Sequence, residues 1–563
     1  MLNNHISRFK LKAETLLESN GLFVTMFAVG LATFFFYMIN AGVLTHDELH
    51  SIMNVREGVY FEKGIVGYLS SPRGLFVLDV FAQFPQYCAT DEVTYRLFDI
   101  AALGIAMYCA YRFMRMLFSK EIGRLFIILF FICASFSDAD YNAFLAFGWT
   151  YKIHIAYLFL LLELIIWHVN TGKRSYLIAS ILLYVFVSGL YEAFVTSCAP
   201  IAALYVYLFK QTGKLTAQRI VRYALYYAIP ELAYLAVYLF MALTAPAHYE
   251  GTKISFERSF FTVIKVTSIY LTGAMPFIRT ANGMRAFASS ILVISPATCF
   301  SWAKSIAFSF YAVYLLRRHD CKPGKLFGFG VVFIVSAFLL CLPYGLSVQY
   351  SDWALNYGMR GCDVSYYAFF LLIAATTCFL AGLSSILKRD SLPPAIAKIF
   401  MAIVFLAFSL IGMHSEYNNR VYAEILDWQD NKYELFDDVV HSKQFADIED
   451  GATIYASGFI GLYHDMSYLS EYASSITGKT YTFINEKPAS GTAYDYVLKY
   501  YPDSSVLALG KNVDGAMLEN MTYYSEHSEI AVSEPNDHTL VIVTATQTNA
   551  ADQEPDIIDG NHV

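Results

Sequence analysis

Charged residues are scarce in this sequence. Asp, Glu, Lys and Arg make up 15% of the chain, whereas soluble domains average about 25%. The deficit falls on residues 1–413, which carry many long apolar runs, while residues 414–547 have the composition of a soluble domain. This distribution excludes a wholly soluble protein. It predicts an α-helical polytopic membrane domain followed by a soluble C-terminal domain.

The sequence also lacks the patterns of several other protein classes. Its net charge of −8 argues against nucleic acid as a partner, because nucleic-acid-binding proteins present a basic surface. Its nine cysteines form no CxxC or Cys/His pattern, which removes the usual zinc sites. None of them lies beyond Cys378, so the C-terminal domain has no disulfide. We therefore predict no cofactor, with a divalent metal left as an open alternative.

The apolar runs set the number of membrane spans. A helix that crosses about 30 Å of hydrocarbon needs roughly 20 apolar residues. The first run, Leu22 to Leu44, is longer than the ~7–15-residue core of a signal peptide and is followed by no cleavage site, so we expect it to be retained. We predict about eleven spans, at residues 22–44, 97–114, 124–137, 153–169, 176–191, 193–209, 222–243, 289–313, 326–343, 366–386 and 398–413.

Clusters of Lys and Arg predict the side on which each loop lies, because cytoplasmic loops are enriched in both residues. The clusters fall in alternate loops of the eleven spans, which places the N-terminus in the cytoplasm and the C-terminal domain outside. One bent span over residues 176–209, in place of two, would move three later clusters to the wrong side. The external loops are then residues 45–96, 138–152, 244–288 and 344–365.

The C-terminal domain, residues 414–547, is predicted to be a small α/β or α+β domain. A helical pattern over residues 423–440 precedes four short β-like runs, ATIYAS, YTFIN, SVLALG and HTLVIVTAT. A helix followed by several strands is typical of such domains. The tail at residues 548–563 is acidic and contains a proline, which predicts disorder.

An acidic stretch, His46-Asp47-Glu48, directly follows the first span. Three interpretations compete. Thr45 and Glu48 have the spacing of a capping box, which would make the acidic groups helix caps. His46, Asp47, Glu48 and His50 are dense in metal-ligand types, although no HExxH motif is present. A carboxylate beside an apolar pocket at the membrane edge would have a raised pKa and suit a general base.

A second acidic pair, Asp138 and Asp140, lies in another external loop. Paired carboxylates suit glycosyl chemistry, in which one carboxylate takes a proton from an acceptor hydroxyl while positive groups stabilise a leaving phosphate. The two acidic stretches, the many helices and an external C-terminal domain together resemble the GT-C superfamily of membrane glycosyltransferases. The layout is similar to that of the bacterial serotype-converting (Gtr) O-antigen glucosyltransferases.

This resemblance implies a function and a site. It implies Asp47 as the catalytic aspartate, with Glu48 beside it, and Asp138 or Asp140 as the second acidic position. It implies an inverting transfer of a hexose from an undecaprenyl-phosphate-linked donor to a surface glycan such as O-antigen of lipopolysaccharide. The reaction would take place at the periplasmic face of a bacterial inner membrane, with membrane lipid around the enzyme.

The leaving phosphate of such a donor needs cations outside the membrane. For each candidate the alternative role is an anchor to lipid headgroups. The candidates are Arg73, Lys152, Arg279, Arg285 and Arg360.

Three other functions stay open. A transporter or flippase of lipid-linked glycans would be expected to show internal repeats and interrupted helices, and we detect no repeat in the sequence. A glycan polymerase would be expected to depend more on external arginines than on a carboxylate after the first span. A non-enzymatic envelope scaffold would tolerate Asp47→Asn, whereas the glycosyltransferase would not.

Overall fold

Two compact units make up the chain. Residues Met1–Ile39 and Asp47–Tyr422 form the membrane unit, and Asn40–His46 with Ala423–Val563 form the C-terminal unit. The membrane unit thus extends to Tyr422, whereas the sequence places the end of the membrane domain at residue 413. The computed structural model describes residues 15–40, 55, 58, 65–66, 69, 77–82, 85, 88–89, 92–136, 144, 148–244, 253, 258–275, 283–356, 363–388, 393–457, 466–485, 494–501, 506–513, 517–525, 528–531, 539–541 and 557–559.

Helices form the membrane unit, and each predicted span overlaps one of them. Among the described residues, nine helical segments are long and apolar enough to cross a membrane, and α9 is a shorter apolar helix. The helices are α2 (Asn20–Asn40), α5 (Val77–Ala82), α6 (Glu92–Leu117), α7 (Lys120–Cys133), α8 (Gly148–Thr171), α9 (Arg174–Leu190), α10 (Cys198–Gln211), α11 (Ala217–Thr244), α12 (Phe260–Gly273), α13 (Gly283–Ser290), α14 (Pro296–Arg318), α15 (Pro323–Leu346), α16 (Val348–Asn356), α17 (Asp363–Leu387) and α18 (Pro394–His441).

Large apolar side chains cover the outside of this unit. On α11, for example, Leu232, Phe240 and Leu243 are 63%, 66% and 76% exposed. A soluble protein rarely exposes so many contiguous apolar groups, whereas a hydrocarbon environment favours them. The predicted α-helical polytopic membrane fold is therefore confirmed.

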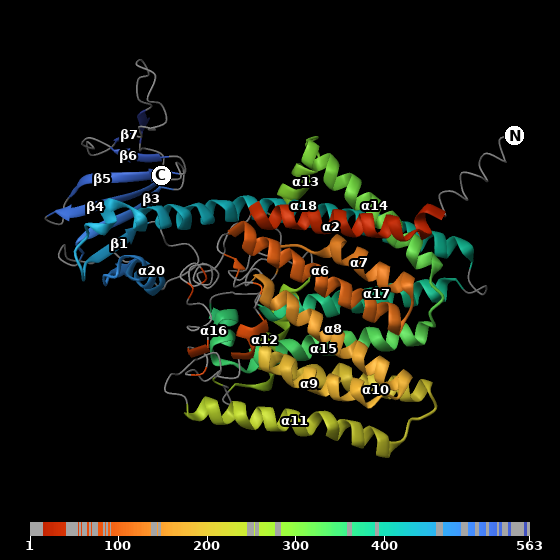
Figure 1. The fold of residues 1–563 in the computed structure, drawn as a ribbon. Helices are drawn as coiled ribbons and strands as arrows, with labels where there is room; N and C mark the ends of the chain where they lie inside the picture. The colour runs from red at the N-terminus through yellow and green to blue at the C-terminus, as the bar shows by residue number, and fades with distance from the viewer. Residues whose placement is uncertain are drawn as a thin grey trace. The chain divides into compact units, whose positions relative to one another are not determined.

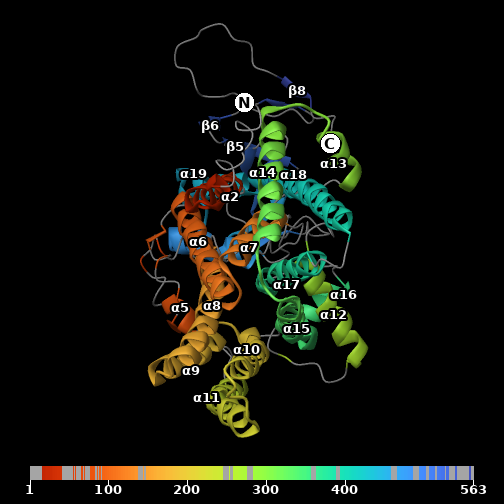
Figure 2. The same cartoon turned by 90° about the vertical axis from the view of Figure 1, so that its right-hand side faces the viewer.

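The helices are stacked in two columns with α7 between them (Figures 1 and 2). One column contains α6, α8 and α9, and the other contains α17, α15 and α12, with neighbours packed in that order. Helix α7 packs against α6, α14 and α17, and every residue from Ile122 to Cys133 is buried. It has only 14 residues, or about 21 Å of helix, because it is enclosed by protein.

One helix begins at a different residue from the one predicted, and one break between helices decides between two predicted alternatives. The span predicted at residues 289–313 begins later, at Pro296, because Ser295 accepts a hydrogen bond from the N–H of Thr298 (3.1 Å) and caps α14. Residues 176–209 form two helices joined by the short 3-10 helix η3 (Glu192–Ser197). The turn is closed by Tyr184, whose hydroxyl donates to the carbonyl of Val195 (2.8 Å), so one bent span is excluded.

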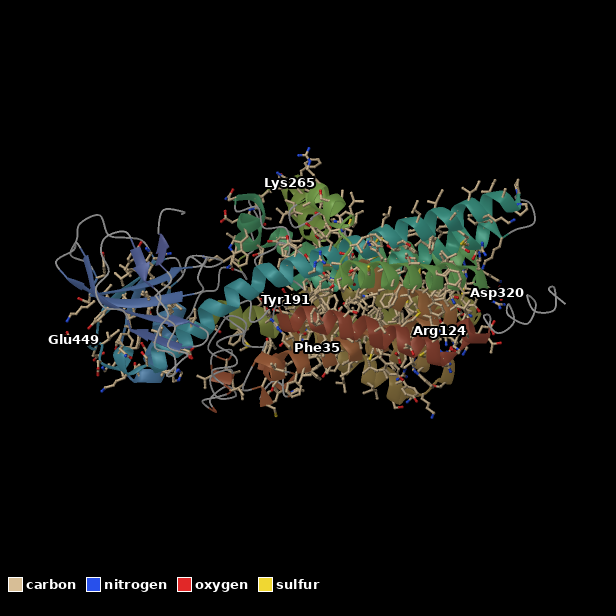
Figure 3. All side chains as sticks on the ribbon, turned by 90° about the horizontal axis from the view of Figure 1, so that it is seen from above. Phe35, Arg124, Tyr191, Lys265, Asp320 and Glu449 are labelled. Atoms are coloured by element: carbon tan, nitrogen blue, oxygen red, sulfur yellow. The ribbon has the colours of Figure 1, made fainter. Side chains whose placement is uncertain are left out.

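Among the described residues, Arg124, Arg318, Lys325 and Lys388 of the predicted basic clusters lie at one end of the unit, which we call the basic end. Arg124 of α7 donates to the carbonyls of Glu18 (3.2 Å) and Ser19 (3.3 Å) before α2. Lys325 donates to the carbonyl of Leu117, and Arg318 pairs with Glu18 (2.8 Å). Arg124 and Asp320 lie toward this end in Figure 3, and Phe35 and Tyr191 lie toward the other. The basic end therefore brings the segment before α2 together with the described loops that follow α6 and α14.

The C-terminal unit is a small α/β domain, as predicted. Its six-stranded sheet has the order β2-β1-β3-β4-β5-β6, with β1 parallel to both neighbours and the later pairs antiparallel. Phe436 of α18 packs on Phe483 of β2 (ring centroids 5.6 Å apart). The remaining elements are α19 (Lys443–Ala446), β1 (Thr453–Ser457), α20 (Ser467–Thr477), β2 (Thr482–Ile484), β3 (Tyr496–Tyr501), β4 (Val506–Val513), β5 (Met517–Ser525), β6 (Ser528–Ala531), and β7 (Thr539–Val541) paired with β8 (Ile557–Asp559).

Candidate active site

Most of the predicted site residues lie outside the described residues, but the helix ends beside them are described. Of the predicted residues, Lys152 and Arg285 are described. The site can therefore be built from the anchors of the loops that carry the others. The predicted residues outside the described ones are Asp47, Glu48, Asp138, Asp140, Arg73, Arg279 and Arg360.

Two buried phenylalanines flank residues 137–143, which we call the acidic loop because it contains Asp138 and Asp140. Phe136 precedes the loop and Phe144 follows it, and both are buried. Both rings pack edge-on against Phe34 of α2, with centroid distances of 5.3 Å and 5.6 Å. One ring of α2 therefore contacts both residues that flank residues 137–143.

Asn419 of α18 binds the backbone just before the acidic loop. Its Oδ1 accepts a hydrogen bond from the N–H of Phe136 (2.7 Å), and its Nδ2 donates to the carbonyl of Ala134 (3.2 Å). The neighbouring Asn418 donates from Nδ2 to the hydroxyl of Ser135 (3.1 Å). Helix α7 ends at Cys133, so its last turn leaves backbone groups without helical partners. Asn419 satisfies two groups of this segment.

The same part of α18 binds the end of α2. The hydroxyl of Tyr37 donates to Oε2 of Glu416 (2.9 Å), and Oε1 of Glu416 pairs with the ammonium group of Lys304 of α14. All three side chains are buried. The ring of Tyr37 also contacts Phe136 (6.5 Å). Glu416 and Asn419 are three residues apart and therefore lie on one face of α18. One helical turn thus holds the chain segments that lead to both predicted acidic sites.

The predicted phosphate ligand Lys152 is buried in an ion pair. Its Nζ lies 2.8 Å from Oδ1 of Asp99, and Nη1 of Arg96 lies 3.3 Å from Oδ2 of the same carboxylate. All three side chains are fully buried. Lys152 also lies over the ring of Tyr366 (5.9 Å), which contacts Phe144 (5.5 Å). A single aromatic ring therefore separates this pair of cations from the anchor of the acidic loop.

The other described candidate, Arg285, is exposed on the short helix α13. Two residues later, Phe287 packs against His414 (5.1 Å) and Tyr417 (5.6 Å) of α18. Arg285 therefore belongs to a helix that rests on the turn of α18 containing Glu416. The side chain of Arg285 is thus exposed, whereas that of Lys152 is buried.

Sequence reasoning missed the polar turn of α18. The stretch HSEYNN, residues 414–419, follows the last apolar run and was assigned to the soluble domain. In the structure Glu416, Asn418 and Asn419 are buried in the membrane unit. The sequence did contain a signal for this turn. A glutamate and two asparagines after an apolar run are compatible with a helix that continues and buries a polar face.

Comparisons with known proteins give distant structural neighbours. No protein-family model and no curated protein matches the sequence. The fold is similar to the archaeal oligosaccharyltransferase AglB from Archaeoglobus fulgidus in complex with an inhibitory peptide and a dolichol-phosphate (11% identity, TM-score 0.35, 84% of this chain and 69% of that one). The apo form of the Archaeoglobus fulgidus enzyme gives 10% identity and a TM-score of 0.37, with 83% and 65% covered.

A third neighbour is of nearly the same length as this chain. It is ArnT from Cupriavidus metallidurans bound to undecaprenyl phosphate, with 10% identity and a TM-score of 0.40. The match covers 86% of this chain and 93% of that one.

Proposed function

We propose that this protein is a GT-C type membrane glycosyltransferase. It transfers a hexose such as glucose from an undecaprenyl-phosphate-linked donor to a surface glycan such as O-antigen, at the periplasmic face of a bacterial inner membrane. One observation carries the proposal: Glu416 and Asn419, one turn apart on α18, hold the end of α2 and the segment before the acidic loop. Both sequence segments with the acidic pattern of the superfamily start from this turn.

The chemistry follows from these residue types. Asp47 accepts the proton of the acceptor hydroxyl, and the resulting oxygen nucleophile forms a bond to the anomeric carbon. The bond from that carbon to the phosphate oxygen breaks on the opposite side, so the configuration inverts. The polyprenyl phosphate leaves with the electron pair. Glu48 and the pair Asp138 and Asp140 are the candidates for orienting the acceptor beside Asp47.

Two kinds of cation stabilise the leaving phosphate in this proposal. Arg285 is exposed, and a guanidinium group binds a phosphate through paired donors. Lys152 and Arg96 are buried around Asp99, so they act through the field they create behind the acidic loop. Arg73, Arg279 and Arg360 remain candidates for direct contacts with the phosphate.

The test compares surface polysaccharide from cells that lack the protein, express it, or express Asp47→Asn. Mass and linkage analysis should show a sugar substituent only with the wild type, while both proteins reach the membrane in equal amounts. Glu18→Gln is the matched control, because Glu18 is an exposed carboxylate at the basic end, and it should retain full transfer. A fully active Asp47→Asn protein would reject Asp47 as the base. Unchanged polysaccharide in every strain would reject the transferase in favour of a transporter or scaffold.

A further inference from the structure

We infer that Asn419 is a positioning residue: its two hydrogen bonds to Ala134 and Phe136 fix the segment from which the chain continues to Asp138 and Asp140. We call these two bonds the Asn419 clamp. The inference rests on the proposed function, since it assigns the clamp a purpose in orienting Asp138 and Asp140 beside Asp47. Neither sequence pattern nor resemblance singled out Asn419.

In the Asn419 clamp, the side-chain carboxamide binds the backbone as a neighbouring β-strand would. The carboxamide donates to the carbonyl of residue 134 and accepts from the N–H of residue 136, as a neighbouring peptide group would. The C-cap of α7, Ala134, has an extended backbone (φ −66°, ψ 115°), so the chain leaves the helix at this point. The side chain of Asn419 and both backbone partners are buried. A buried backbone group that loses its hydrogen bond also loses the compensation for its desolvation, so this exit direction is strongly preferred.

The position of the clamp explains why it would matter for catalysis. Asp138 follows Phe136 by two residues, and two residues of chain reach at most about 7 Å. A displacement of Phe136 is therefore transmitted almost directly to the acidic loop. The other end of the loop is held at Phe144 by packing against Phe34, which does not involve Asn419. Loss of the clamp should release one end of the loop and leave the other in place.

Asn419 also couples the two acidic segments. Its helix binds Tyr37 through Glu416 one turn earlier, and Phe136 contacts both Phe34 and Tyr37 of α2. The clamp therefore sets the segment before Asp138 against the helix that leads to Asp47. Misplacement of a catalytic group by about 1 Å can cost roughly 100-fold in rate, which is the scale of effect expected here.

The test uses the full-length protein in detergent with a polyprenyl-phosphate hexose and the glycan acceptor. In Asn419→Ala we expect kcat to fall about 10- to 100-fold, while KM for the donor changes less than twofold. Hydrogen exchange of the peptide covering residues 134–144 should become faster. Ser384→Ala is the matched control: it removes a buried bond from a side chain of α17 to the carbonyl of Leu316 of α14 (2.6 Å) at the basic end. Its kcat and its exchange at residues 134–144 should equal those of the wild type.

A second variant covers the case in which Asn419→Ala fails to fold. Asn419→Asp keeps the volume and the acceptor for Phe136 but, when ionised, has no donor for Ala134, so it should lower kcat in the same direction by a smaller factor. An active enzyme whose kcat and local exchange are unchanged in these variants would overturn the clamp alone. A wild type that transfers no sugar would overturn the proposed function and the catalytic purpose of the clamp, and unchanged exchange would then separately overturn its effect on the loop.

Discussion

At the basic end of the membrane unit, Lys325 and Lys388 bind backbone oxygens, whereas beside the candidate active site Lys152 and Lys304 bind buried carboxylates. Lys388 donates to the carbonyl of His319 (2.8 Å), and Lys325 donates to that of Leu117. Carbonyls at helix C-termini lack helical partners and carry partial negative charge. These bonds join neighbouring helices without placing any carboxylate in the interior.

At the opposite end, ion pairs are buried, and burying them costs more desolvation free energy than hydrogen bonds to carbonyls. Lys304 pairs with Glu416, and Lys152 pairs with Asp99, in buried surroundings. Removing both charges from water carries a penalty that the pair recovers only with good geometry. Arg112 of α6 also pairs with a buried carboxylate, Glu163 of α8 (3.0 Å). Since Lys325 and Lys388 show that helices can be joined without such pairs, Asp99 and Glu416, which each bind two buried side chains, indicate a requirement beyond stability. Ionisable groups inside membrane proteins mark functional regions, and here one aromatic ring separates Glu416 from Phe136 and Lys152 from Phe144.

Removing one carboxylate from each end should expose this difference most strongly. Glu416→Ala leaves Lys304 buried without its partner, and the free energy of unfolding should fall by about 3–5 kcal/mol. Glu18→Ala breaks the exposed pair with Arg318 and should cost less than about 1 kcal/mol. Thermal and denaturant unfolding in the same detergent would measure both. Equal losses in the two variants would contradict a special role for the buried pair.

A Gly→Ala substitution at each end should also distinguish the two ends, with a smaller change in the free energy of unfolding. A Cβ at Gly412 of α18 would lie 2.8 Å from the hydroxyl and 3.0 Å from Cβ of Ser305, beside Lys304. Gly412→Ala should therefore separate α14 from α18 and destabilise the protein by about 1–3 kcal/mol. At Gly382 the nearest atoms belong to the ring of Phe327, at 3.0 Å, and this side chain can shift.

The measurement is again unfolding in detergent, now combined with transfer activity. Gly412→Ala should lose activity as well as stability, because the turn that follows Gly412 binds Tyr37 and Phe136. Gly382→Ala should lose little of either. The comparison fails if Gly382→Ala is the more damaging of the two substitutions.

The sequence predicts the helices well because their signal is local. Apolar length and the positions of Lys and Arg depend on short windows, so every predicted span overlaps a helix and the basic clusters meet at one end. In the C-terminal unit, the runs at β1, β2, β4 and β7 were recognised. Strand β3, YVLKYY, and strand β5, MLENMTYYS, were missed. Both carry lysine or glutamate among their apolar residues, and pairing with β1 and β4 for β3, and with β4 and β6 for β5, makes them strands.

The candidate site depends on contacts that no local pattern contains. Asn419 and Phe136 are 283 residues apart, and Glu416 and Tyr37 are 379 apart. HSEYNN alone has the composition of a surface stretch, and only the packing of α18 on α2, α7 and α14 makes it interior. For the same reason Lys152 was predicted as a ligand for phosphate, while its pairing with Asp99, 53 residues away (152 − 99), could not be predicted.

The last contrast between the two ends concerns pH, and its effect should be the smallest. His319 lies just after α14 at the basic end and is 1% exposed. Burial, reinforced by the charge of Lys388, lowers the pKa of His319 to about 4, while Asp320 and Glu121 oppose the shift. The unfolded chain therefore binds a proton between about pH 6.5 and pH 4 that the folded chain does not bind. This contribution to stability is complete above pH 6.5 and is lost as the pH falls toward 4.

In His319→Met the fall in Tm between pH 7.5 and pH 5 should be smaller than in the wild type. The same fall in both proteins would show that groups elsewhere set the acid sensitivity, which would remove His319 from the account of the basic end.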